Sequence, residues 1–139
     1  MTDTHRIAII EDEIDIAFIL EASLEATGSY DLRVIHDPTN ALSELALFQP
    51  ELVLLDWMMP GIDGLTLSGE IAKTQKAAGV SIVLMTARSR VQELIGLANS
   101  VDAVLAKPFE PSRVVAGIDH FFRSGRFDDV FLTNLEKAS

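Results

Sequence analysis

Residues suited to phosphate or metal chemistry follow four short apolar segments of this chain. Glu11 and Asp12 come directly after the first segment, and Asp56 follows the third. Thr86 follows the fourth segment and Lys107 the fifth. Carboxylates, a hydroxyl and an ammonium are the groups that bind a divalent cation and a phosphoryl group. The spacing therefore indicates phosphoryl chemistry, provided that the fold brings the four positions together.

A carboxylate such as that of Asp56 can act as a nucleophile and form an acyl phosphate. Its proximity to Glu11 and Asp12 would be costly, because like charges repel each other. A magnesium ion removes this cost, since it binds one or two carboxylates together with water and a phosphoryl oxygen. Lys107 and Thr86 would then neutralise and position the phosphoryl group, which is what its transfer requires.

Each of these residues also has a purely structural interpretation. Acidic residues after strands often serve as turn and capping residues, Thr86 could be the N-cap of a following helix, and Lys107 could be an exposed loop lysine. Asp56 is harder to explain in this way, because it follows Val53-Leu54-Leu55 and a buried carboxylate is costly unless it is paired. The coincidence of four strand ends favours the functional interpretation.

The apolar segments alternate with helical patterns along the chain. The expected strands are 7–10, 32–35, 52–55, 82–85 and 103–106, and the expected helices are 14–26, 38–46, 65–76, 91–98 and 111–122. Short apolar strands without alternation are typical of a sheet that is buried on both faces. The pattern predicts an α/β fold, a doubly wound five-stranded parallel sheet with helices on both faces. Such sheets bind ligands at the carboxyl ends of their strands.

The apolar positions of the helices predict which faces are buried. They are Ile14, Ala17, Phe18 and Leu24 in the first helix, Leu42, Leu45 and Ala46 in the second, Val91, Leu94, Ile95 and Ala98 in the fourth, and Val114, Val115, Ile118, Phe121 and Phe122 in the fifth. Asp37 is the expected N-cap of the second helix, with Pro38 at its first position. Residues 124–139 remain as a C-terminal tail or linker remnant, in which Phe127, Phe131 and Leu135 could line one side of a short helix.

The composition limits the classes of function. The 139 residues include 21 acidic and 11 basic side chains, which give a formal charge of −10. This net charge repels nucleic acid, so direct DNA binding is not expected. The chain contains no cysteine, which excludes a disulfide framework or a thiolate metal site. No signal peptide or membrane span is evident, and we expect a cytoplasmic protein without a membrane partner.

Over residues 5–123 the chain resembles the receiver domain of two-component response regulators. The matching text is Ile9-Ile10-Glu11-Asp12-Glu13, then Val53 to Gly61 with Asp63-Gly64, then Met85-Thr86-Ala87-Arg88, and finally Lys107-Pro108-Phe109. The order and spacing of these motifs together are highly specific. The resemblance implies the flavodoxin-like strand order 2-1-3-4-5 and a receiver domain over residues 1–123. We expect a stand-alone receiver, similar to a chemotaxis regulator.

The resemblance also implies how a phosphoryl group is bound. Asp56 would be the phosphoacceptor, Thr86 and the amide of Ala87 would bind phosphoryl oxygens, and Lys107 would pair with the phosphoryl group. Glu11, Asp12, Asp56 and the carbonyl of Met58 would hold Mg²⁺, with Asp12 as a direct ligand and Glu11 acting through water. A cis peptide between Lys107 and Pro108 is a further implication.

The partners implied by the resemblance are proteins. A phosphohistidine on a histidine kinase or phosphotransfer protein would be the phosphodonor, and phosphorylation would change binding to a downstream protein target that the sequence does not name. A phosphorylation-dependent homodimer is a further expectation. No enzymatic activity is expected beyond catalysis of the domain's own phosphorylation and dephosphorylation.

The chain departs from the receiver pattern around its fifth strand. Val104 replaces the usual Tyr or Phe three residues before the lysine, Ser100-Val101 replaces a common Gly-Ala pair, and the spacing from Thr86 to Lys107 is about one residue shorter than usual. A rotamer change of Val104 moves little volume, and β-branched side chains are stiff. We therefore predict that activation acts through the backbone from Thr86 to Arg90.

Other functions fit the residues less well. A haloacid-dehalogenase-like phosphatase needs a second aspartate two residues after the nucleophile, where this chain has Met58. A dinucleotide-binding domain needs a glycine-rich first turn, where this chain has acidic residues. Two alternatives stay open: a receiver-like interaction module that works without phosphorylation, and an N-terminal fragment of a larger regulator with an output domain.

Overall fold

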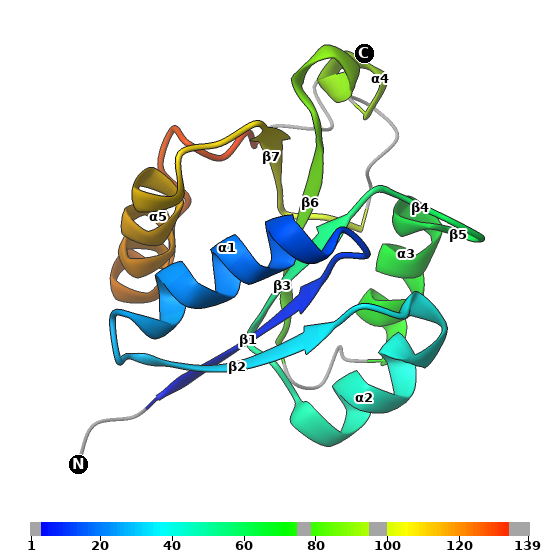
Figure 1. Cartoon of the computed structure of the whole chain (residues 1–139), viewed down its shortest axis with the longest axis horizontal. Helices are drawn as coiled ribbons and strands as arrows, with labels where there is room; N and C mark the ends of the chain where they lie inside the picture. Colours follow the sequence, from blue (N-terminus) through cyan, green and yellow to red (C-terminus); the bar gives the residue numbers. More distant parts are fainter. Residues whose placement is uncertain (1–3, 75–78, 95–99, 134–139) are drawn as a thin grey trace.

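A five-stranded parallel sheet forms the centre of the molecule (Figure 1). The computed structural model describes residues 4–74, 79–94 and 100–133. In spatial order the strands are β2 (Tyr30–Ile35), β1 (His5–Ile10), β3 (Leu52–Asp56), β6 (Ser81–Ala87) and β7 (Ala103–Lys107). All neighbouring pairs are parallel. When these five strands are counted along the chain, the order is 2-1-3-4-5, as predicted.

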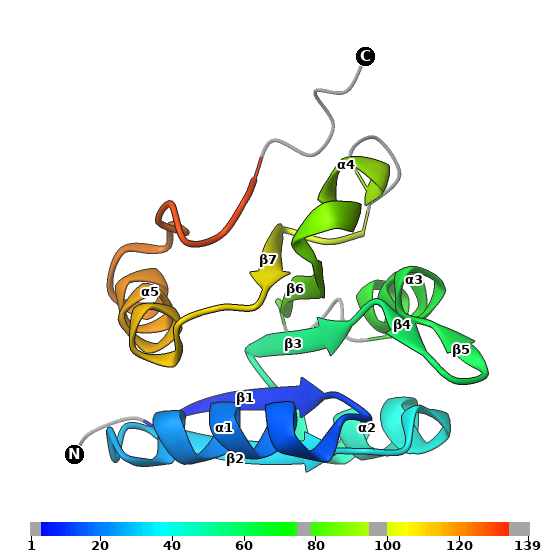
Figure 2. The same cartoon turned by 45° about the horizontal axis from the view of Figure 1, so that its top comes forward.

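Helices cover both faces of the sheet (Figure 2). One face carries α1 (Ile14–Glu25) and α5 (Pro111–Ser124), and the other carries α2 (Ala41–Phe48), α3 (Gly64–Thr74) and α4 (Val91–Leu94). Successive strand residues point to opposite faces, so Ile9 packs with the core under α1 and α5 while Ile10 packs with the core under the other helices. The doubly wound α/β prediction is confirmed.

The strands are longer than the apolar segments that predicted them. Asp56, predicted to follow its strand, is the last residue of β3 and lies opposite Met85 of β6. Thr86 likewise lies within β6, opposite Ala106, and Lys107 is the last residue of β7. The ladder continues into these polar residues because parallel pairing uses backbone groups and does not depend on apolar side chains.

Two of the predicted helix faces were partly wrong. In α1 the buried residues are Ala17, Leu20 and Leu24, whereas Ile14 and Phe18 are 67% and 65% exposed. The buried residues recur at spacings of three and four, and Phe18 lies about 100° around the helix from Ala17. In α2 the predicted face included Ala46, which is exposed, although Leu45 is buried as expected.

The remaining helix predictions hold where they fall on described residues. Val91 and Leu94 are buried in α4, and Val114 and Ile118 in α5, where Val115, Phe121 and Phe122 are half-buried. Residues 75 and 76 of the expected third helix, and Ile95 and Ala98 of the fourth, lie outside the described residues. No helix in the described part of the chain has the length and apolar character needed to cross a bilayer.

Short irregular elements connect the main ones. Asp37 accepts a hydrogen bond from the Thr39 amide, which confirms it as a cap, although the element that it caps is a 3-10 turn over Pro38–Asn40 that leads into α2. An unpredicted hairpin, β4 (Met58–Met59) with β5 (Ile62–Asp63), follows β3. Its turn contains Gly61 at a φ of +80°, where glycine has no steric penalty.

The described part of the C-terminal tail returns to the sheet after α5. After α5, residues 125–133 contain no helix, so the short helix suggested by Phe127 and Phe131 is not found there, and Leu135 lies outside the described residues. Leu132 forms an antiparallel bridge with Val104 of the edge strand β7. Phe131 is 3% exposed and belongs to the core under α1 and α5.

Candidate functional site

The predicted site residues meet at the carboxyl ends of four strands. Glu11 and Asp12 follow β1, Asp56 ends β3, Thr86 lies near the end of β6, and Lys107 ends β7. Because β1, β3, β6 and β7 are consecutive neighbours in a parallel sheet, their carboxyl ends lie side by side at one end of the sheet. The fold therefore produces the convergence that the sequence predicts.

Three carboxylates cluster at the carboxyl ends of these strands. One oxygen from each of Glu11, Asp12 and Asp56 lies within 4.8 Å of the others. Glu11 and Asp56 are buried, with 0% and 5% of their surfaces exposed. Oxygen ligands at this separation suit a hard divalent cation such as Mg²⁺, which would also offset the repulsion between the carboxylates.

Lys107 joins two of these carboxylates. Its Nζ donates to Oε1 of Glu11 at 2.8 Å and to Oδ1 of Asp56 at 3.1 Å, and it lies 4.0 Å from a carboxylate oxygen of Glu13. The other carboxylate oxygen of Glu11 accepts a hydrogen bond from the backbone amide of Glu13 at 3.1 Å. The single ammonium of Lys107 therefore neutralises only part of the charge of the cluster.

The pKa values follow from this arrangement. Burial raises the pKa of Glu11 from 4.5 to about 7, opposed by the hydrogen bond from Lys107 and reinforced by the charge of Asp56. Burial also raises the pKa of Asp56, although Lys107 opposes it. Burial alone would lower the pKa of Lys107, but its hydrogen bonds and charge interactions with Glu11 and Asp56 raise it above the ordinary value.

Thr86 carries a buried hydroxyl without a partner. The residue is 3% exposed, and its Oγ1 forms no hydrogen bond with any described residue. Buried polar groups are nearly always hydrogen-bonded, and an orphan hydroxyl calls for a specific explanation. A phosphoryl oxygen bound at the end of the neighbouring strand β3 would provide the missing partner.

The remaining predicted residues lie around this centre. Ala87 is the exposed last residue of β6, opposite Lys107, and Met58 begins the β4–β5 hairpin one residue beyond Trp57. The Lys107–Pro108 peptide is cis, as predicted. The structure brings every predicted site residue to the same end of the sheet.

Sequence reasoning missed two structural features beside Asp56. A Cβ atom at Gly64 would lie 2.2 Å from the carbonyl oxygen of Asp56, so this glycine packs directly against the backbone of Asp56. The guanidinium of Arg90 lies 4.8 Å from the centre of the Trp57 ring and bonds to Glu93. The sequence contains no signal for this contact, because it depends on the path of the chain after β6.

Comparison with known proteins identifies the family. The model of the response regulator receiver domain matches residues 7–119. This chain belongs to that family. The receiver domain is 35% identical over 119 residues to the DNA-binding response regulator MtrA of Mycobacterium tuberculosis, covering 84% of this chain and 50% of that protein. It is 36% identical over 122 residues to the transcriptional regulatory protein BaeR of Escherichia coli, covering 87% and 49%.

Solved structures support the same assignment. A putative response regulator from Chloroflexus aurantiacus superposes with a TM-score of 0.76 at 27% identity, covering 87% of this chain and 99% of that one. The receiver domain of a DNA-binding response regulator from Colwellia psychrerythraea superposes at 0.73 with 25% identity, covering 86% and 99%. The receiver domain spans about half the length of the curated relatives that it matches.

Proposed function

We propose that this receiver domain is a signalling switch that accepts a phosphoryl group on Asp56 and thereby changes its binding to partners. The observation that carries the proposal is the buried carboxylate of Asp56, bonded to Lys107 and next to a strand whose Thr86 hydroxyl is buried without a partner. Asp56, Lys107 and Thr86 thus place a nucleophile, a cation and a hydrogen-bond donor together at the carboxyl end of the sheet.

The residues divide the chemistry between them. A carboxylate oxygen of Asp56 would attack phosphorus, and the bond from phosphorus to the donor nitrogen would break as the acyl phosphate forms. The ammonium of Lys107 would pair with the phosphoryl oxygens, while the Thr86 hydroxyl and the Ala87 amide would donate hydrogen bonds to them. Each group acts by position and charge, so no further catalytic residue is needed.

The acidic cluster suits Mg²⁺. Asp12 and Asp56 would bind the ion directly, Glu11 would bind through water, and the carbonyl of Met58 would add a ligand. The bound ion supplies positive charge that stabilises the phosphoryl oxygens during transfer. The clustering of one carboxylate oxygen from each of Glu11, Asp12 and Asp56 within 4.8 Å supports this assignment.

The proposed phosphodonor is a histidine kinase or phosphotransfer protein in the cytoplasm, and the only catalysis by the domain is its own phosphorylation and dephosphorylation. An apolar pocket lined by Ile16, Ile19 and Phe109 adjoins Lys107, and Phe18 is exposed on the same helix, α1. This surface would let a protein donor dock beside Asp56.

The downstream partner could be part of the same protein or a separate molecule. The matched relatives are named as DNA-binding or transcriptional regulators and are about twice as long as the matched region, so an output domain in the same protein is one case. A separate protein target, or a homodimer formed on phosphorylation, is the other. The acidic charge of −10 argues against direct contact of this domain with nucleic acid.

A second candidate is an interaction module that never uses phosphorylation. Its site residues would have only structural roles. The orphan hydroxyl of Thr86 argues against this candidate, because an unbonded buried hydroxyl is costly and gives no structural benefit in return.

Labelling with acetyl phosphate and Mg²⁺ tests the proposal. We expect the intact mass to rise by one phosphoryl group, with the group on Asp56. Asp56→Asn should abolish labelling, because an amide is a far poorer nucleophile, and Lys107→Ala should reduce it. Asp31→Asn is the matched control, since Asp31 is an exposed carboxylate outside the acidic cluster. Normal labelling of Asp56→Asn would refute the proposal.

The packing also supports a route by which the signal would leave the site. Val104 is fully buried in the core with Val91 and Leu94 of α4. Its side chain therefore does not occupy an exposed position from which it could swing inward on activation. The backbone from Thr86 to Arg90 runs from the site through a 3-10 turn into α4. We propose that phosphorylation pulls this segment toward Asp56 and shifts α4 between two packed arrangements.

Methyl and amide NMR with and without beryllofluoride, an analogue of the phosphoryl group, tests this route. We expect large shifts of the amide signals from Thr86 to Leu94, while the Val104 methyl groups keep one rotamer. The opposite pattern, with Val104 moving between buried and exposed positions beside an unchanged segment, would contradict it.

A further inference from the structure

The loop that carries Glu11 and Asp12 is anchored to the end of β2. The last paired residues of β1 and β2 are Ile10 and Ile35, and one residue further the amide of Glu11 donates to the carbonyl of Ile35 at 3.2 Å. His36, the residue after β2, then bonds through Nδ1 to the carbonyl oxygen of Glu11 at 3.2 Å. A carbonyl oxygen only accepts hydrogen bonds, so Nδ1 of His36 carries the hydrogen and donates it.

The ring of His36 replaces a backbone donor of the sheet. In a regular parallel ladder the carbonyl of Glu11 would accept the next inward-facing amide of the neighbouring strand, that of Asp37. The chain turns away at this point, because Asp37 caps the 3-10 turn that begins at Pro38. Its carboxylate accepts hydrogen bonds from the amide and the hydroxyl of Thr39. The side chain of His36 therefore extends the ladder by one bond where the backbone of β2 leaves it.

This bond acts on the peptide group that joins two residues of the acidic cluster. The carbonyl of Glu11 and the amide of Asp12 belong to one planar unit, so a donor that fixes the carbonyl also fixes the direction in which the chain leads to Asp12. The side chain of Glu11 is already held, since Lys107 bonds to one carboxylate oxygen at 2.8 Å and the Glu13 amide to the other at 3.1 Å. The bond from His36 therefore bears mainly on the placement of Asp12.

His36 is not a core residue. Its side chain is exposed and belongs to neither hydrophobic core cluster, so its replacement leaves no cavity. At an exposed position water can replace a lost hydrogen-bond donor, which keeps the effect on stability small. Water does not supply a donor at a fixed position, however, so the orientation of the peptide between Glu11 and Asp12 would be lost.

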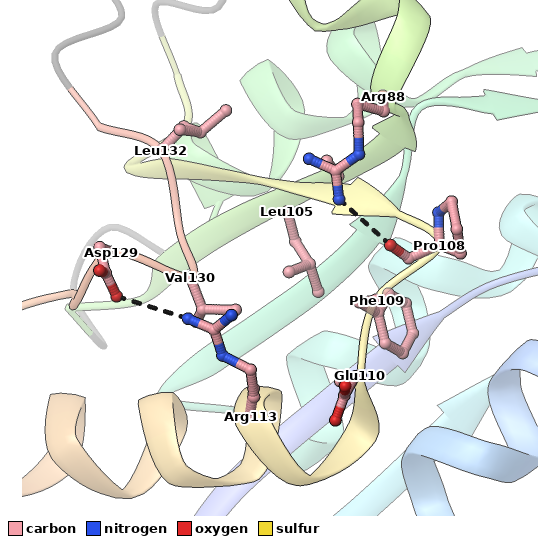
Figure 3. Close-up of a pocket in the computed structure, with 10 residues that line it drawn as sticks. Arg88, Leu105, Pro108, Phe109, Glu110, Arg113, Asp129, Val130 and Leu132 are labelled. Carbon is pink, nitrogen blue, oxygen red and sulfur yellow. Dashed lines mark hydrogen bonds and ion pairs between the residues drawn. The ribbon is translucent and has the colours of Figure 1, made fainter.

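A comparable bond at the other half of the site is longer. Arg88, two residues after Thr86, donates to the carbonyl oxygen of Pro108 at 3.4 Å (Figure 3). N–H···O hydrogen bonds are typically roughly 2.7–3.2 Å long, so the bond from His36 lies within the usual range and the bond from Arg88 does not. Of these two side chains, only His36 bonds to the backbone of the site at an ordinary distance.

We propose that His36 is a positioning residue for the metal-binding half of the site: by holding the peptide between Glu11 and Asp12, it directs the Asp12 carboxylate toward Asp56 and sets the affinity for Mg²⁺. The inference rests on the proposed function, since it takes the acidic cluster as the Mg²⁺ site. Mg²⁺ requires near-ideal octahedral geometry, whereas Ca²⁺ accepts irregular arrangements of oxygen ligands. Loss of the bond from His36 should therefore weaken the binding of Mg²⁺ more than that of Ca²⁺.

Calorimetric titration of the full chain with MgCl₂ and with CaCl₂ tests the proposal. His36→Phe keeps a ring but removes the donor, whereas His36→Asn places an amide N–H at the position of Nδ1. We expect the Kd for Mg²⁺ to rise about fivefold in His36→Phe and the Kd for Ca²⁺ to rise less than about twofold. His36→Asn should restore Mg²⁺ binding. His120→Phe makes the same chemical change on α5 and should leave both constants unchanged.

A second measurement uses metal-free protein. The amide of Asp12 belongs to the peptide group that accepts the bond from His36, so its NMR signal should shift in His36→Phe and return toward the wild-type position in His36→Asn. The melting temperature of the metal-free protein should change little in either variant, because the side chain is exposed. A lower melting temperature together with unchanged Mg²⁺ affinity would show a purely structural role and overturn the proposal.

Two further results would count against the positioning role. Equal losses of Mg²⁺ and Ca²⁺ affinity in His36→Phe would show that the geometry of the site is not what changed. A loss in His36→Phe that His36→Asn does not restore would show that the hydrogen bond is not responsible. If wild type itself does not bind Mg²⁺, the failure lies instead with the acidic cluster as a metal site, and thus with the proposed function.

Discussion

Gly64→Ala should lower the free energy of unfolding by about 3 kcal/mol. The added Cβ would lie 2.2 Å from the carbonyl oxygen of Asp56 and 2.8 Å from the Cα of Trp57. Both atoms belong to the backbone at the end of β3, which the sheet and the Gly64–Trp57 hydrogen bond at 2.7 Å hold in place. Relief of the clash requires α3 or the end of β3 to move, so the site itself must deform.

Gly69→Ala in the same helix is the matched control. Its Cβ would have Ser100 Oγ as nearest neighbour, at 3.6 Å, which is ordinary contact. Replacing a helical glycine by alanine should then stabilise the protein by roughly 0.5–1 kcal/mol. Urea unfolding of both variants measures the contrast, and equal stability of the two would show that α3 does not pack against Asp56 as described.

In the metal-free protein, stability should fall as the pH rises from about 5 to about 8. Glu11 has a pKa of 4.5 when exposed and about 7 in the folded protein, so the folded state binds more protons than the unfolded state between these values. The stabilising contribution of Glu11 is therefore fully present below pH 4.5 and is lost as the pH rises through 7. The loss from Glu11 is on the order of 3 kcal/mol, and the raised pKa of Asp56 acts in the same direction.

Asp56→Asn should remove part of this loss. The variant keeps the Glu11–Lys107 pair but has no second buried carboxylate to repel Glu11, so at pH 8 in EDTA it should be more stable than wild type by about 1 kcal/mol or more. Added Mg²⁺ should stabilise wild type more than the variant. Thermal and urea unfolding with and without Mg²⁺ measure both effects, with Asp31→Asn as the control. A variant that unfolds more easily than wild type at pH 8 would contradict a shared acidic pocket.

The sequence was sufficient for the sheet and the predicted site because both depend on local patterns. Apolar segments such as 52–55 are long enough only for buried strands, and the polar residues after them must meet once the strands are parallel. Ile14 and Phe18 were misplaced because an apolar helical residue beside the buried stripe has the same sequence signature as one within it.

Features that depend on long-range packing were not predictable in this way. The side chains of residues 128, 130 and 131, which follow α5 in the chain, pack closely against Gly117. A single glycine in a helical sequence does not show which residues will pack against it. The bridge from Leu132 to Val104 likewise involves a tail without a strand pattern. The Arg90–Trp57 contact requires the 3-10 turn after β6 to bring a cation over the residue that follows Asp56.

That last contact gives the molecule a built-in optical probe. Trp57 is the only tryptophan of the chain. It is covalently next to the proposed phosphoacceptor on one side, and its ring faces Arg90, at the end of the proposed switch segment, on the other. Its indole emission responds to the field of a nearby charge, so phosphorylation of Asp56 and displacement of Arg90 would both change the fluorescence. The kinetics of the two events can thus be followed in unlabelled protein, and a change that lags behind phosphoryl incorporation would resolve the chemical step from the conformational one.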